Sequence, residues 1–127
     1  MQSLLGIWKL VEGRAFDEAG RETSSPFGPT PMGLVVFERE RMMGMAADGR
    51  PVLPPGTPGR GFFSYTGTYQ LDGDTLTTRV DGASSPDGLA DQVRRISFQG
   101  PNRFVAVPLS RVLDRTSGLE FVWERVG

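Results

Sequence analysis

Two tyrosines near the middle of the chain have the clearest capacity for chemistry, because Tyr65 and Tyr69 stand on either side of Gly67 in a β-rich stretch. Alternate residues of a strand point to the same face, so these three are expected to share one face. If that face is turned inward, two phenols reach a common cavity and Gly67 leaves room for a ligand. The alternative is that both tyrosines pack structurally, with their hydroxyls bonded to backbone or water.

Arginines would supply the cationic donors of such a cavity, since the chain has 14 Lys and Arg residues and Lys9 is its one lysine. The planar guanidinium fork suits carboxylates and enolates. Codon usage in a GC-rich genome also produces many arginines. Arg79 lies on the strand expected beside the tyrosines and Arg95 on the strand beyond it, so these two are the candidates. A Tyr–Arg pair could polarise a carbonyl or stabilise an enolate.

The chain contains no Cys and no His. Disulfides, thiolate nucleophiles and Cys-ligated metals are therefore excluded, and the usual general base and commonest metal ligand are missing. We expect no metal and no cofactor. The groups left for general acid or base catalysis are the phenols of Tyr65 and Tyr69 and the carboxylates of Glu12 and Glu38.

Length and charge narrow the choice of partner. A chain of 127 residues is expected to form one domain, spanning 1–127. The formal net charge is -1, with no basic stripe for nucleic acid and no amphipathic or polybasic segment for a membrane surface. The N-terminus enters an apolar strand without a signal-peptide pattern. We therefore expect a cytoplasmic, bacterial protein whose partner is a small molecule.

The residues that would position this chemistry form strands. Runs 62–71 and 75–80 are rich in Thr, Tyr and β-branched residues and flank an Asp-Gly turn, which is a strong hairpin signal. Clusters among the 17 Gly and 10 Pro separate six further apolar runs, at 4–12, 33–37, 41–47, 91–99, 103–108 and 119–126. Eight strands joined to their sequence neighbours predict an all-β fold: a single eight-stranded antiparallel up-and-down β-barrel, wide enough for one small ligand.

Two connections and one strand could shape the cavity. The connection 13–31 is predicted to be an Ω-loop or a lid, in which Phe27 either anchors the loop to the core or lines a pocket. The Pro-rich segment 50–60 is expected to be a stiff loop at the barrel mouth or edge. Met42, Met43 and Met45 either fill the core or line a ligand cavity.

Five segments in order along the chain resemble the bacterial lipocalin-like domain family. They are L-G-I-W-K-L-V at 5–11, P-M-G-L-V-V-F at 31–37, Y-T-G-T-Y at 65–69, Q-V-R-R-I at 92–96 and W-E-R at 123–125. The resemblance implies a calycin-type barrel with a central cavity. It also implies that Gly6 and Trp8 form a structural plug at the closed end, under Arg125 or, as second choice, Arg95.

The chain departs from the family pattern in two places. The strand after the hairpin turn often carries His in the family, where this chain has Thr77, Thr78 and Arg79. Any role of that His is therefore absent or has passed to Arg79. The segment 50–60 is Pro-rich where the family is often longer and helix-prone, so the cavity entrance is expected to differ in shape.

Three functions stay open at this point. The first is binding of a hydrophobic, aromatic or polyketide-like small molecule, and the second is a cofactor-independent cyclase or isomerase acting by shape and Tyr/Arg hydrogen bonding. The third is a structural barrel that forms a homodimer through the apolar outer face of strands such as 33–37. The candidate ligand-binding residues are Tyr65, Tyr69, Arg79, Arg95, Phe27, Met43 and Trp123.

Overall fold

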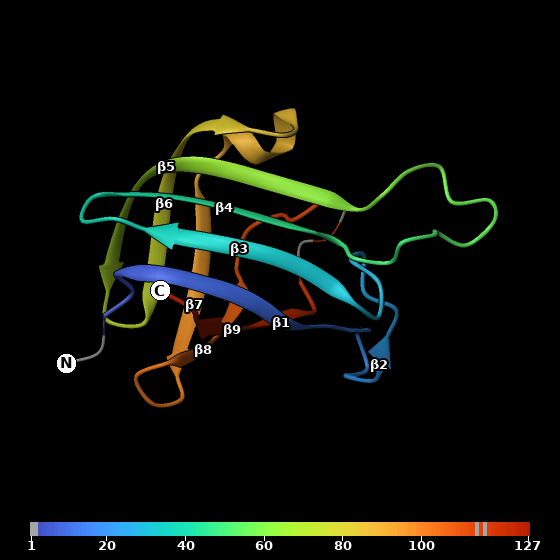
Figure 1. Ribbon diagram of the computed structural model, residues 1–127, viewed down its shortest axis with the longest axis horizontal. Helices are drawn as coiled ribbons and strands as arrows, with labels where there is room; N and C mark the ends of the chain where they lie inside the picture. Colours follow the sequence, from blue (N-terminus) through green and yellow to red (C-terminus); the bar gives the residue numbers. More distant parts are fainter. Residues whose placement is uncertain (1–2, 114, 116) are drawn as a thin grey trace.

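Eight antiparallel strands close into a barrel, so the predicted fold class is confirmed. The computed structural model describes residues 3–113, 115 and 117–127. Within these residues the strands follow one another around the ring, and β1 pairs with β9 to close it (Figure 1). The bounds are β1 Gly6–Phe16, β2 Glu22–Thr23, β3 Pro31–Phe37, β4 Arg41–Asp48, β5 Phe62–Asp72, β6 Thr75–Ala83, β7 Gln92–Phe98, β8 Arg103–Pro108 and β9 Leu119–Arg125, with a 3-10 turn η1 at Pro86–Leu89.

The predicted hairpin is present as β5 and β6, which pair from Asp72 opposite Thr75. Gly73 is the first of the two turn residues and has φ 63°. A type II′ turn needs positive φ at this position, which glycine adopts without strain. Glycine therefore fixes the register that sets which face of β5 points inward.

The predicted single connection over 13–31 is wrong at its start. Strand β1 continues to Phe16, and β2 turns back so that Ala15 pairs with Thr23. Ala15 is fully buried although it is out of step with the buried Trp8 and Leu10. A β-bulge between Leu10 and Glu12 shifts the alternation by one position, and it lies where the polar residues suggested a loop. The carboxylate of Asp17 holds the turn by accepting hydrogen bonds from the backbone N–H of Ala19 and Arg21.

The barrel interior holds two apolar clusters, one toward each end. One surrounds Trp8 and includes Phe37, Met42 and Phe104, and the other surrounds Phe27 and includes Phe63 and Phe121. Both chain ends lie at one end of the barrel, and the long β4–β5 loop projects from the other (Figure 1). Tyr65 and Trp123 pack against both clusters, so they mark the middle of the barrel.

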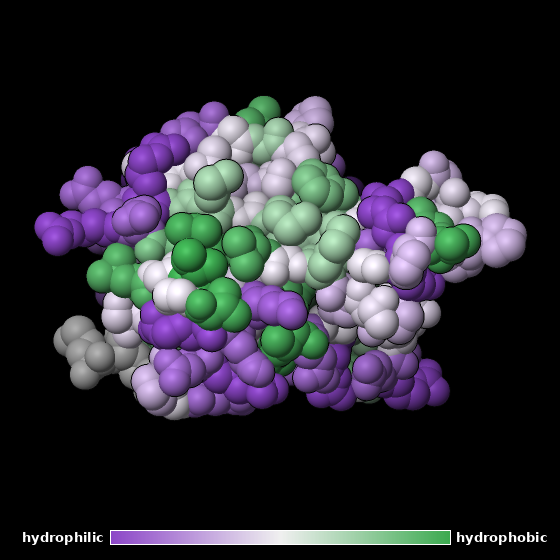
Figure 2. Space-filling view, viewed as in Figure 1, coloured by the Kyte–Doolittle hydropathy of each residue, from purple (hydrophilic) through white to green (hydrophobic). Residues whose placement is uncertain are grey.

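The outer wall carries an apolar surface over neighbouring strands. Ile7 on β1, Leu34 on β3, Met43 on β4 and Phe62 on β5 are all exposed. Figure 2 shows hydrophobic side chains gathered on this face. The face is the one expected from the sequence to be apolar, and a homodimer through it stays a prediction.

Candidate ligand-binding site

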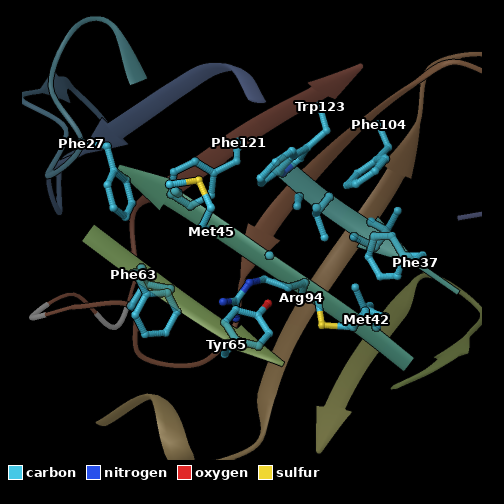
Figure 3. A pocket seen from close by; sticks show the side chains of 17 residues that line it. Phe27, Phe37, Met42, Met45, Phe63, Tyr65, Arg94, Phe104, Phe121 and Trp123 are labelled. Carbon is cyan, nitrogen blue, oxygen red and sulfur yellow. The ribbon is translucent and has the colours of Figure 1, made fainter. Parts of the chain in front are cut away.

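A cavity of about 70 Å³ lies between the two apolar clusters inside the barrel (Figure 3). Its walls are mostly apolar, and the aromatic rings among them are those of Phe27, Phe37, Phe63, Phe104, Phe121 and Trp123. Met42 and Ala106 add aliphatic surface. Among the described lining residues, Tyr65 carries the one hydroxyl and Arg94 the one charge. The site is therefore an apolar chamber with a single polar corner.

The polar corner begins with β5, whose tyrosine face points inward. Phe63 and Gly67 are buried on either side of Tyr65, whereas Phe62 and Thr68 on the other face are exposed. The Tyr65 ring packs against Phe63 at a centroid distance of 5.5 Å. Its hydroxyl makes no hydrogen bond to any described residue, so its donor and acceptor capacity remains available to the cavity.

Tyr69 lies on the same face but serves the rim of the barrel. Its ring meets Phe37 edge-on at 5.0 Å, and its hydroxyl donates to the Glu38 carbonyl oxygen at 2.6 Å. Burial, and then the charge of Glu38, raises the pKa of the Tyr69 phenol. It does not line the cavity, and Glu12 and Glu38 are exposed outside it. Of these candidate acids and bases, the structure places only Tyr65 at the cavity.

Arg94 is the charged group of the cavity, and it is only 7% exposed. Its guanidinium carbon lies 5.5 Å from the centroid of the Tyr65 ring. Nη1 donates to the Val93 carbonyl at 3.1 Å and to Ser110 Oγ at 3.0 Å, and Nη2 donates to Gln92 Oε1 at 3.1 Å. No acidic side chain among the described residues forms an ion pair with it.

A hydrogen-bond network fixes the position of Arg94. The amide nitrogen of Gln92 donates to the carbonyls of Gly88 and Ala90, so its oxygen must face the guanidinium. Ser110 Oγ accepts from the Val93 N–H and donates to Gln92 Oε1. The turn η1 thus orients Gln92, and Gln92 with Ser110 orients Arg94.

Three expected ligand-binding residues lie on the outer surface instead. Arg79 and Arg95 are exposed, and Met43 is 60% exposed. Strand alternation gives the reason, because their buried neighbours are Thr78, Arg94 and Met42. Arg79, Arg95 and Met43 therefore do not line the cavity, whereas Phe27 and Trp123 do.

The sequence contained a signal for Arg94 that was missed. On β7, Arg94 alternates with Ile96 and Phe98, which are apolar, whereas Arg95 alternates with Val93 and Ser97. The face shared with two large apolar side chains is the one expected to be buried. This comparison would have assigned the inward arginine to position 94.

One end of the barrel is closed by Trp8, a residue of β1. Trp8 is fully buried, and its indole N–H donates to the Leu4 carbonyl at 2.8 Å. The Arg125 guanidinium lies 4.2 Å from the Trp8 ring and donates to the carbonyls of Leu5 and Ser3. Gly6 has φ 126°, and a Cβ there would lie 2.6 Å from Arg125 Nη1. The contact implied by the family resemblance is thus present with Arg125, not Arg95.

The opposite end is closed by Phe27, on the loop 24–30, and the loop depends on Asp48 at the end of β4. Asp48 is buried, and its carboxylate accepts hydrogen bonds from the backbone and guanidinium of Arg50. The hydrogen bonds from Arg50, with help from the charge of Arg60, hold the pKa of Asp48 below its ordinary value although burial raises it. Gly28 passes so close that a Cβ would lie 2.7 Å from this carboxylate.

A closed barrel around an apolar cavity with one polar corner defines the class of small barrels that can hold a ligand inside. The chain belongs to the lipocalin-like domain family, whose pattern matches residues 5–126. Lipocalin-like barrels bind small hydrophobic ligands. No curated protein matches the chain.

Among solved structures, a redesigned β-barrel is similar over 98% of this chain and 92% of its own, with 16% identity and a TM-score of 0.49. In the part of the chain that the structure describes, no helix is long and apolar enough to cross a membrane. The described residues also contain no cluster of three or more Asp and Glu side chains placed to hold a metal ion.

Proposed function

We propose that the barrel binds one hydrophobic small molecule in its central cavity. The observation that carries this proposal is the apolar chamber inside the barrel, in which Tyr65 and Arg94 form the only polar corner among the described lining residues. Ligand sites commonly combine apolar walls with a few convergent polar groups. Membership of the lipocalin-like domain family supports the same function.

The size of the cavity restricts the ligand. A volume of about 70 Å³ is well below the roughly 300–1,000 Å³ of sites for drug-sized molecules. A cavity of about 150 Å³ is known to bind benzene, so even a single aromatic ring with a short chain requires the wall to expand, and a fused polycyclic ligand would require more. Met42 and the loop that carries Phe27 are the parts of the wall best able to adjust, because methionine is flexible and the loop is not part of a strand.

Titration with cinnamyl alcohol, a slender apolar probe, tests binding. Methyl NMR signals of Ile96 and Ala106, which line the cavity, are expected to shift saturably and to show contacts with the probe ring. Ala106→Phe should abolish binding by filling the cavity, and Val105→Phe, on the neighbouring position of β8, is the control. Native mass spectrometry of the purified protein then searches for a bound natural ligand. If cavity methyls respond neither to the probe nor to a natural ligand, the proposal fails.

Catalysis as a cyclase or isomerase is a second candidate, favoured by the shared position of Tyr65 and Arg94. A carbonyl oxygen at this corner could receive hydrogen bonds from both groups, which would stabilise the enolate that forms when solvent hydroxide removes an α-proton. Exchange of the α-hydrogens of 4-phenyl-2-butanone in heavy water measures this effect directly. We expect Tyr65→Phe to slow the exchange and Tyr69→Phe to leave it unchanged. An exchange rate equal to that of buffer alone would exclude this chemistry for the probe.

A further inference from the structure

We infer that the ligand is an anion, with a carboxylate as the simplest case, and that Arg94 and Tyr65 receive its charged oxygens. This inference rests on the proposed function, since it names the chemical class of ligand for the same cavity. Its basis is the charge, the free donors and the fixed position of Arg94.

The charge of Arg94 has no counterpart in the described structure. Other arginines have acidic partners: Arg14 pairs with Glu22, Arg41 with Asp81 and Arg50 with Asp48. Arg94 is more deeply buried than any of these, yet its recorded partners are a backbone carbonyl, a hydroxyl and an amide, all neutral. A buried charge without an opposite charge is unfavourable, so an anion entering the cavity would gain an unusually strong partner.

The unused donors of Arg94 have the geometry that a carboxylate needs. The end of the guanidinium is occupied by two acceptors. Ser110 Oγ accepts from Nη1 and Gln92 Oε1 accepts from Nη2, and these two oxygens lie 3.2 Å apart. The Nε–H and the second N–H of Nη2 have no acceptor among the described residues. These two groups lie on one edge of the planar guanidinium, where a carboxylate can bind through both oxygens.

Tyr65 completes the subsite. Its ring lies against the guanidinium, and its hydroxyl has no partner among the described residues. Figure 3 shows both side chains directed into the same chamber, with the aromatic walls beyond them. A ligand oxygen held by Arg94 can therefore receive a further hydrogen bond from Tyr65 while its apolar part lies among the rings.

The subsite is formed before any ligand arrives. Gln92 is almost fully buried and is anchored to carbonyls at and just after η1, and Ser110 is anchored to β7. Gln92 and Ser110 are therefore positioning residues, which keep the guanidinium from rotating toward solvent. Holding donors in place reduces the ordering cost of binding.

The test compares trans-cinnamate with cinnamyl alcohol, which share a carbon skeleton and differ in charge. Calorimetry and the cavity methyl signals report both affinities. We expect cinnamate to bind at least about tenfold more tightly, since hydrogen bonds to charged groups are the strong ones. Arg94→Met should remove this preference, so that the acid and the alcohol bind with similar affinities. Arg95→Met is the matched control, because the neighbouring arginine is exposed.

Gln92→Glu provides a second variant that keeps the arginine and the size of the neighbouring side chain, although it removes the amide's hydrogen bonds to Gly88 and Ala90. It places a carboxylate where the amide oxygen now accepts from Arg94 Nη2, so cinnamate should lose most of its advantage over the alcohol. Equal binding of acid and alcohol to the native protein, or an unchanged preference in Arg94→Met, would overturn the anion subsite and leave the proposed function intact. Absence of both probes from the cavity would overturn the proposed function itself.

Discussion

The two ends of the barrel are each closed by a fully buried aromatic ring, but they are held in different ways. Trp8 belongs to β1 and is covered by Arg125 of β9, whose guanidinium donates to backbone carbonyls. Phe27 belongs to the loop 24–30, and that loop packs against the carboxylate of Asp48, which is paired with Arg50. One closure is therefore a residue of the sheet, and the other lies in a loop that packs against a charge pair at the end of β4.

This difference indicates which end opens first. Opening the Trp8 end requires β1 and β9 to separate, and these strands pair along most of their lengths. Opening the Phe27 end requires the loop to leave the Asp48 carboxylate and Phe27 to leave its apolar cluster. It also breaks the hydrogen bond from the Gly49 N–H to the Thr30 carbonyl, but it separates no two strands of the barrel. Local opening is cheapest where few buried contacts and few ladder hydrogen bonds are lost. The Phe27 end is therefore the expected route into the cavity.

The largest effect expected is the loss of stability in Trp8→Ala. Removal of a fully buried Trp should lower the free energy of unfolding by about 3–5 kcal/mol. Phe27→Ala should cost less, about 2–3 kcal/mol, because a loop can collapse into the space more readily than a strand. Urea unfolding measures both values. If Trp8→Ala does not fold, Trp8→Phe keeps the comparison measurable. Equal losses at the two ends would contradict the distinction between them.

Glycines provide a finer version of the same comparison. Gly6 and Gly28 both have positive φ, and a Cβ at either would lie within 3 Å of the residue that holds its end, Arg125 or Asp48. Gly6→Ala should lower the free energy of unfolding by roughly 1–3 kcal/mol, since strained backbone is forced inside the sheet. Gly28→Ala should have a smaller global effect and should instead increase amide exchange in the loop 24–30. Loss of protection along β1 in Gly28→Ala would argue against a separate loop.

The same contrast explains how far the sequence alone could lead. Alternation and turn residues predicted the barrel and the hairpin β5–β6, because strand pairing and glycine turns are local consequences of residue type. The Gly6–Trp8–Arg125 contact followed from a family resemblance. Three of the residues predicted to bind a ligand, Tyr65, Phe27 and Trp123, line the chamber, and their role in binding stays a prediction. Tyr65 and Trp123 could be placed from the alternation of side chains along a strand, and Phe27 from being the one large apolar residue in its loop.

The wrong placements arose where the prediction had to decide which of two neighbouring strand residues points inward. Met43 and Arg95 each lie beside the inward residue, so a shift of one position exchanged the cavity wall for the outer surface. The Asp48–Arg50 pair was missed because an Asp-Gly after an apolar run is also the ordinary end of a strand. Its role depends on the loop 24–30, which reaches Asp48 only in the folded barrel.

The smallest effect expected is a pH dependence confined to the Phe27 end. The pKa of the Asp48 carboxyl is lowered in the folded protein, chiefly by the hydrogen bond from Arg50. A lowered pKa means that the ionised form contributes stability above the pKa of the unfolded chain, about 4, and that this contribution is lost as pH falls through the folded-state value. Protonation should therefore weaken the contact between loop 24–30 and β4.

Amide protection factors measured between pH 7 and pH 3 test this dependence. Protection in the loop 24–30 should fall below about pH 4, whereas protection around Trp8 should stay constant, because Arg125 is held by carbonyls that do not titrate. Asp48→Asn should show the weakened loop already at pH 7 and no further change on acidification. Equal loss of protection at the Phe27 end and at the Trp8 end would mean that acid acts on the whole barrel. The Asp48–Arg50 pair would then not account for the difference between the two ends.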